Sequence, residues 1–160
     1  IAGIAFSSGL LGIVHSMAHK TGAAYSGDHI IHGCANAMYL GKVIQFNAKV
    51  PAAKTRYAYI AKEILHLAGE TEDELVEALV QEIRDLNDKL DVPQGIKNYG
   101  QYGVKADESI IDYAEFEAKK SEVAANALLD ACTLSNPRKP TQEEMEQLLE
   151  CVYKDEPVNF

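Results

Sequence analysis

The sequence predicts a single domain built only from α-helices. Three observations carry this prediction: apolar residues recur at helical spacing along most of the chain, no strand-like alternation persists, and two capping boxes of the form Thr-x-x-Glu mark helix starts. The 160 residues can bury roughly 70% of the surface that the unfolded chain exposes. We therefore expect residues 1–160 to form one all-helical core without the help of disulfides.

The first predicted helix is apolar on most sides, which is typical of a helix in the middle of a domain. Its apolar positions are Ile4, Leu10, Leu11, Val14 and Met17. Gly22 and the turn-forming residues 25–28 end this helix. A second helix of the same buried character is expected from about Gly33 to Asn47.

The next two helices are predicted from their start signals. Pro51 stands at a first-turn position for a helix that should reach His66, with Gly69 as its stop. Thr71 with Glu74 then forms a capping box ahead of an amphipathic helix that ends at Val92-Pro93. The apolar stripe of that helix is Leu75, Leu79, Ile83, Leu86 and Leu90.

The C-terminal part is predicted to hold two more helices. Residues 94–103 are rich in glycine and tyrosine and are expected to form a loop, after which a long helix should run from Asp107 towards Ala131. Two prolines within residues 136–140 interrupt the chain. Thr141, with Glu three residues later, begins a final helix that is expected to continue to about Tyr153.

Composition excludes several classes of function. The chain has 15 Lys+Arg against 24 Asp+Glu, a net charge of −9, so we expect neither nucleic acid nor a membrane surface as a partner. The phosphate-binding loops GxGxxG and GxxxxGK[ST] and the hydrolase motif GxSxG do not occur. Cys34, Cys132 and Cys151 form no CxxC pair, which favours free thiols in the cytoplasm. Because residue 1 is isoleucine, we expect the chain to be part of a longer protein.

A histidine cluster is the main chemical signal. His15, His19, His29 and His32 fall within 18 residues, and the first two lie one helical turn apart on the same face. Imidazole suits zinc, iron, copper or nickel, and a catalytic site needs about three protein ligands and an open position. A core histidine bonded to a carbonyl is the alternative for each one. The HxxxH spacing lacks the Glu of HExxH, so a zincin-type protease is not supported, and His66 is expected to be structural.

Three blocks of the sequence resemble the iron-containing (group III) alcohol dehydrogenases. Residues 2–7 and 11–20, which end in HSMAHK, match one block. Residues 29–37 resemble the HxPHGxANA segment of that family, and residues 130–138 resemble its DxCTxxNPR segment. The blocks stand in the order that the family has and span about 135 residues, most of the chain.

The resemblance implies the helical C-terminal domain of a two-domain enzyme of the kind shared with dehydroquinate synthase, with the N-terminal α/β nucleotide-binding domain outside this chain. In the family a divalent metal lies between the domains, held by one Asp and three His. His15 and His32 match two of those ligands. His19 matches the histidine near the nicotinamide that places the cofactor or relays a proton, and Phe6 and Cys132 match the substrate pocket. The implied cofactors are Fe²⁺, with Zn²⁺ as the alternative, and NAD or NADP held mainly by the other domain.

One departure from the family pattern leaves two candidates for the second ligand. The sequence carries about three extra residues before His32, and Ile31 stands where the family usually has Pro. Spacing alone selects His29, which follows His15 by fourteen residues, whereas alignment on the Gly-x-Ala-Asn-Ala that follows selects His32. We expect His32, because lengthening a loop costs little free energy while shifting a helix start would move the ligand itself.

The resemblance implies an NAD(P)-dependent alcohol dehydrogenase that transfers hydride between a short-chain primary alcohol or diol and the nicotinamide, with the alkoxide polarised by the metal. By itself the chain is expected to be inactive, because half the ligands lie elsewhere. The full-length protein is expected to be a homo-oligomer. Two rival functions remain: a zinc enzyme of the same fold similar to glycerol dehydrogenase, and a non-catalytic helical metal-binding module.

Overall fold

A computed structural model describes the chain except for residues 2, 5–8, 10 and 26–29. The helices are α2 (Ile13–Ala24), α3 (His32–Asn47), α4 (Pro51–Tyr59), α5 (Glu72–Lys89), α6 (Tyr113–Leu128) and α7 (Gln142–Lys154). Among the described residues there is no β-strand, only an isolated bridge between Tyr99 and Lys105. The all-α prediction is confirmed. No helix in this described part is long and apolar enough to cross a membrane.

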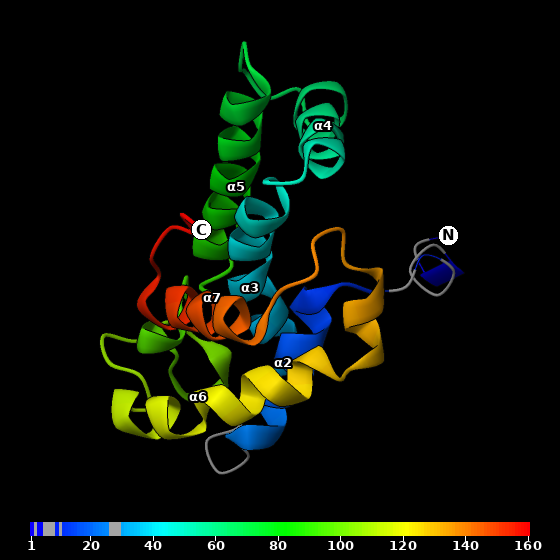
Figure 1. The fold of residues 1–160 in the computed structure, drawn as a ribbon. Helices are drawn as coiled ribbons and strands as arrows, with labels where there is room; N and C mark the ends of the chain where they lie inside the picture. The colour runs from blue at the N-terminus through cyan, green and yellow to red at the C-terminus, as the bar shows by residue number, and fades with distance from the viewer. Residues whose placement is uncertain (2, 5–8, 10, 26–29) are drawn as a thin grey trace.

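The helices pack around α2 and α3. Helix α2 lies between α3 and α6, while α3 also packs on α5 and α7, and α4 and α5 project from one end of the molecule (Figure 1). The main core is built from fully buried side chains of α2, α3, α6 and α7, among them Met17, Tyr39, Phe116 and Leu148. A second, smaller apolar cluster lies under α3, α4 and α5. The buried character predicted for the first two helices follows from their central place.

Both predicted capping boxes are formed. The backbone N–H of Glu74 donates to Thr71 Oγ1 at 3.2 Å, and the Glu74 carboxylate accepts from the Thr71 N–H at 3.1 Å. Thr141 and Glu144 make the same reciprocal pair at the start of α7, with distances of 3.2 and 2.9 Å. Pro51 occupies the first position of α4, as predicted.

Two predicted boundaries in the first half of the chain hold only in part. Helix α2 ends at Ala24 and Tyr25, the first of the residues predicted to end it, is its C-cap, but Gly22 lies inside the helix, where a Cβ would meet the Ile30 carbonyl at 3.5 Å. The helix predicted to reach His66 changes into a π-helical turn at Ile60–Ile64, in which the Leu65 N–H donates to the carbonyl five residues earlier at 3.0 Å. The π-helical turn ends at Ile64, just before the predicted end at His66.

The long helix begins at Tyr113, after the predicted start at Asp107. Two backbone N–H groups within residues 106–110 bond to the preceding loop instead: the Ala106 N–H donates to the Asn98 carbonyl at 2.9 Å and the Ile110 N–H to the Tyr99 carbonyl at 3.0 Å. Helix α6 therefore starts at Tyr113, where the Asp112 carboxylate accepts from a first-turn N–H at 2.8 Å. The predicted loop 94–103 contains two short 3₁₀ turns, Ile96–Asn98 and Gln101–Gly103.

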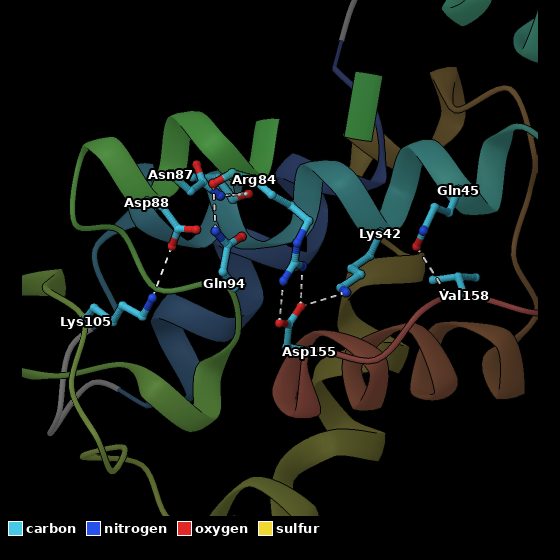
Figure 2. Close-up of polar contacts among 10 residues, drawn as sticks. Lys42, Gln45, Arg84, Asn87, Asp88, Gln94, Lys105, Asp155 and Val158 are labelled. Carbon is cyan, nitrogen blue, oxygen red and sulfur yellow. Dashed lines mark hydrogen bonds and ion pairs between the residues drawn. The ribbon is translucent and has the colours of Figure 1, made fainter. Parts of the chain in front are cut away.

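An ion-paired group joins α3, α5 and the end of α7. Asp155, in the left-handed conformation that ends α7, accepts from both terminal nitrogens of Arg84 at 2.6 and 2.8 Å and from Lys42 Nζ at 2.9 Å (Figure 2). The Lys42 side chain is only 8% exposed, so its charge depends on this partner. This group fixes α3, which carries His32, relative to two other helices.

A buried amide joins the start of α2 to the end of α3. Asn136 Oδ1 accepts from the Ile13 N–H at 3.3 Å and from Asn47 Nδ2 at 3.2 Å, while Asn136 Nδ2 donates to Asn47 Oδ1 at 2.8 Å. Gly12 is required beside it, because a Cβ there would lie 2.8 Å from Asn136 Oδ1. The segment that follows α6 is thereby held against the first turn of α2.

Candidate metal centre

Three histidines gather where α2 meets the start of α3. His15 and His19 lie one turn apart on α2, and His32 is the first residue of α3. The ring centroids of His15 and His32 are 5.3 Å apart, those of His19 and His32 are 5.0 Å apart in a stacked arrangement, and those of His15 and His19 are 6.0 Å apart. His29, the alternative ligand, lies outside the described residues, as does Phe6 of the predicted substrate pocket.

The environment of His15 keeps its imidazole neutral. Burial lowers the pKa of His15, and the neighbouring rings of His32 and His19 lower it further, because a second positive charge beside them would be unfavourable. A metal binds the unprotonated imidazole nitrogen. His15 is therefore prepared to act as a ligand near neutral pH.

The second ring is held by an amide in the first turn of α3. Asn36 Nδ2 lies 2.9 Å from His32 Nε2, and the buried Asn36 Oδ1 has no hydrogen-bond partner among the described residues. Which end of an amide faces a ring is set by the hydrogen-bond network, and turning this amide over would let Oδ1 accept the Nε2 proton. Nδ1 of His32 would then carry the lone pair that a metal needs, an arrangement common for metal-bound histidines. The donor set fits a divalent transition metal.

His19 is oriented by an aspartate from a distant segment. Its Nδ1 lies 3.4 Å from Asp130 Oδ2, which also pairs with Lys20 Nζ at 2.9 Å. Burial raises the pKa of Asp130, but the N–H of Cys132 and the ammonium of Lys20 outweigh it and hold that pKa far below its usual range. Asp130 is therefore a carboxylate at neutral pH, and it favours the His19 tautomer with the proton on Nδ1 and the lone pair on Nε2.

Cys132 lies next to this pair. Single donor atoms of Cys132, Asp130 and His19 all fall within 4.8 Å of one another. Burial, followed by the nearby Asp130 carboxylate, raises the pKa of the Cys132 thiol, so it is protonated in this environment. Asp130 and Lys20 had no predicted role, although both lie in the sequence blocks that carried the family resemblance.

The other singled-out residues lie outside this cluster. His66 is exposed beyond the π-helical turn, with a left-handed φ of 56°. Cys34 and Cys151 are half-buried free thiols that pack against the main core. An apolar groove of about 430 Å³ is lined by Val14 of α2, Leu40 of α3 and Ile60 of the π-helical turn, and none of the clustered histidines lines it.

The chain is similar to known alcohol dehydrogenases along nearly its whole length. The sequence model of the Fe-containing alcohol dehydrogenase family, C-terminal, matches residues 1–153. The NADPH-dependent butanol dehydrogenase of Clostridium saccharobutylicum is 48% identical over 160 residues, which are 100% of this chain and 37% of that protein. The 1-propanol dehydrogenase of Salmonella typhimurium is 36% identical over 151 residues, covering 94% of this chain and 37% of that protein.

Solved structures show the same fold. The alcohol dehydrogenase from Oenococcus oeni superposes with a TM-score of 0.76 at 28% identity, covering 95% of this chain and 35% of that one. The iron-containing alcohol dehydrogenase from Thermococcus thioreducens gives a TM-score of 0.68 at 31% identity, covering 91% and 32%. The chain spans little more than a third of the length of these relatives. It belongs to the iron-containing alcohol dehydrogenase family and corresponds to the C-terminal part of that family.

Proposed function

We propose that this chain is the metal-binding part of an NAD(P)-dependent dehydrogenase that interconverts a short-chain primary alcohol and its aldehyde. The observation that carries the proposal is the convergence of His15, His19 and His32, with ring centroids 5.0–6.0 Å apart, at the junction of α2 and α3. The relatives named for butanol and 1-propanol support this substrate class.

His15 and His32 are the residues that would hold the metal. A divalent ion bound there supplies a Lewis acid for the alcohol or aldehyde oxygen. His15 contributes a neutral imidazole because its surroundings disfavour protonation. Asn36 orients His32 from one helical turn away. Two protein ligands leave coordination positions open, and we propose that residues outside this chain complete the ligand set.

His19 is proposed to handle the proton of the reaction. The Asp130 carboxylate 3.4 Å from Nδ1 leaves Nε2 as the nitrogen that accepts or donates a proton, and it stabilises the imidazolium that forms. Stacking on His32, one of the two proposed metal ligands, fixes the plane of the His19 ring beside the proposed metal site. Lys20 fixes Asp130 in turn. Cys132 is proposed to border the substrate beside His19.

An anaerobic Fe²⁺ titration tests the proposed site. The chain and the variants His15→Ala, His32→Ala and Cys132→Ser are compared by calorimetry, with His66→Ala as a control in an exposed histidine away from the cluster. We expect weak binding that Cys132→Ser and His66→Ala leave unchanged, and that His15→Ala and His32→Ala each abolish when combined with Cys132→Ser. Binding that survives in both of these combined variants would refute the assignment of His15 and His32.

A second experiment tests whether this chain is active by itself. The chain alone, supplied with Fe²⁺, NAD⁺ or NADP⁺ and 1-butanol, should produce no nicotinamide absorbance change, because the proposal places the remaining ligands and the nucleotide site elsewhere. Alcohol-dependent reduction of the nicotinamide by this chain would contradict that placement. Tight Fe²⁺ binding without turnover in the full-length protein would instead favour the non-catalytic metal-binding module.

A further inference from the structure

His19, Asp130 and Cys132 bring three different metal-binding atoms together beside, and separate from, the pair His15 and His32. The three donor atoms lie within 4.8 Å of one another, one each of nitrogen, oxygen and sulfur. Imidazole, carboxylate and thiolate are the three protein ligand types that zinc uses. His19 is 41% exposed at its side chain, so an ion can reach the group from solvent.

The backbone that carries these donors is fixed in advance. Asp130 and Cys132 begin the 3₁₀ turn η4 (Ala131–Ser135), and the Asp130 carboxylate accepts from the Cys132 N–H at 3.0 Å. The turn is attached to α2, which carries His19, by a 2.9 Å hydrogen bond from Thr133 Oγ1 to Ser16 Oγ. A metal would therefore order little more than side chains, which keeps the entropic cost of binding small.

The distances are compatible with a tetrahedral ion after a small adjustment. Zinc–ligand bonds of about 2.0–2.3 Å place neighbouring donors roughly 3.3–3.8 Å apart. The separation of Asp130 Oδ2 from His19 Nδ1 is already 3.4 Å. An ion bound to these atoms takes the place of the proton on His19 Nδ1 and of the Cys132 thiol proton, and both protons are released to solvent. Because no two of the three donor atoms are more than 4.8 Å apart, bringing them to these separations requires a movement of roughly 1 Å or less, within reach of side-chain rotation.

Lys20 is the group that opposes such an ion. Its ammonium lies 2.9 Å from Asp130 Oδ2 and occupies the carboxylate lone pairs that a metal would need. The Lys20 side chain is 32% exposed, so it can turn into solvent when a divalent ion replaces it.

We infer that His19, Asp130 and Cys132 form a second binding site, for a thiophilic divalent ion such as Zn²⁺ or Co²⁺, with Lys20 as the cation that the ion displaces. One consequence rests on the proposed function: an ion bound to His19 removes the proposed proton-transfer group, so occupation of this site would inhibit the enzyme.

Co²⁺ titration of the double variant His15→Ala/His32→Ala tests the site, because the first pair of ligands is then absent. We expect one equivalent of Co²⁺ to bind and to give the near-ultraviolet thiolate-to-cobalt charge-transfer absorption. In this background Cys132→Ser should abolish the absorption, whereas Cys34→Ser should retain it. Zn²⁺ should displace the cobalt and bleach the absorption.

Two further variants separate ligation from misfolding. Asp130→Asn keeps an oxygen for the Cys132 N–H but removes the charge, and it should weaken Co²⁺ binding about tenfold or more while the far-ultraviolet circular dichroism is unchanged. Lys20→Gln should strengthen binding several-fold. Absence of the thiolate absorption, or its survival in Cys132→Ser, would overturn the inference, and neither result bears on Fe²⁺ binding by His15 and His32.

Discussion

Replacing Asp155 by Asn should destabilise the whole helical domain. Asp155 is the common partner of Arg84 and Lys42, which come from α5 and α3, and Asn preserves the size of the side chain and tolerates the left-handed backbone at φ 57°. What the substitution removes is the negative charge. Lys42 is 8% exposed at its side chain and would keep a positive charge without its counter-ion.

The structure sets the size of the effect. Removing one partner of a buried ion pair costs about 3–5 kcal/mol. Here the Arg84 side chain is 33% exposed and can be hydrated, so we expect the lower end, about 3 kcal/mol in the free energy of unfolding. For a chain of this size that corresponds to a fall in Tm of roughly 6–12 °C.

Urea and thermal unfolding followed by circular dichroism measure this difference. Asp91→Asn is the matched control, because Asp91 has the same left-handed φ of 57° but is exposed. The control should change the free energy of unfolding by no more than about 0.5 kcal/mol. If Asp155→Asn costs no more than Asp91→Asn, the ion-paired group does not hold the three helices together and the reasoning is refuted.

The same pair of proteins gives a pH test. Burial raises the pKa of Asp155, but hydrogen bonds from Arg84 and Lys42 outweigh it and hold the pKa below its usual value. A carboxyl with a lowered folded-state pKa stabilises the fold above its unfolded pKa of about 3.9 and loses that contribution as the pH falls through the folded value. The stability difference between the wild type and Asp155→Asn should therefore be constant near neutral pH and shrink below about pH 4.

Three further substitutions should each lower the free energy of unfolding in urea. Gly95→Ala should cost about 1–3 kcal/mol, because its Cβ would lie 2.6 Å from the Val152 carbonyl oxygen. The control Gly33→Ala should not destabilise, because its Cβ would meet nothing within 4 Å, and equal costs in the two variants would contradict the steric argument. Asn136→Ala should cost about 2–3 kcal/mol because it leaves buried donors unpaired, and a near-neutral result would show that water replaces the amide. Thr141→Ala should cost about 1 kcal/mol by removing the cap of α7, and an unchanged midpoint would exclude that role.

Helix starts could be predicted from the sequence because their signals are local. A threonine with a glutamate three residues later satisfies two N–H groups wherever the pair stands, and both predicted boxes are present. The ends of helices, and the start of α6, which has no capping box, were predicted less well. The stretch before Tyr113 is compatible with a helix by composition, but its N–H groups bond to the loop of Asn98 and Tyr99, which only the packed structure brings within reach.

The sequence by itself determined the all-helical class, the family blocks and the identity of His15, His19 and His32 as a group, because these depend on residue types at short spacings. Only the tertiary structure decided that Asp130 lies against His19 and that Asp155 joins two other helices. Thr133 and Ser16, whose hydrogen bond fixes the first of these contacts, are 117 positions apart. Contacts over such separations form when the apolar faces of helices pack together, and a local sequence pattern does not specify which faces meet.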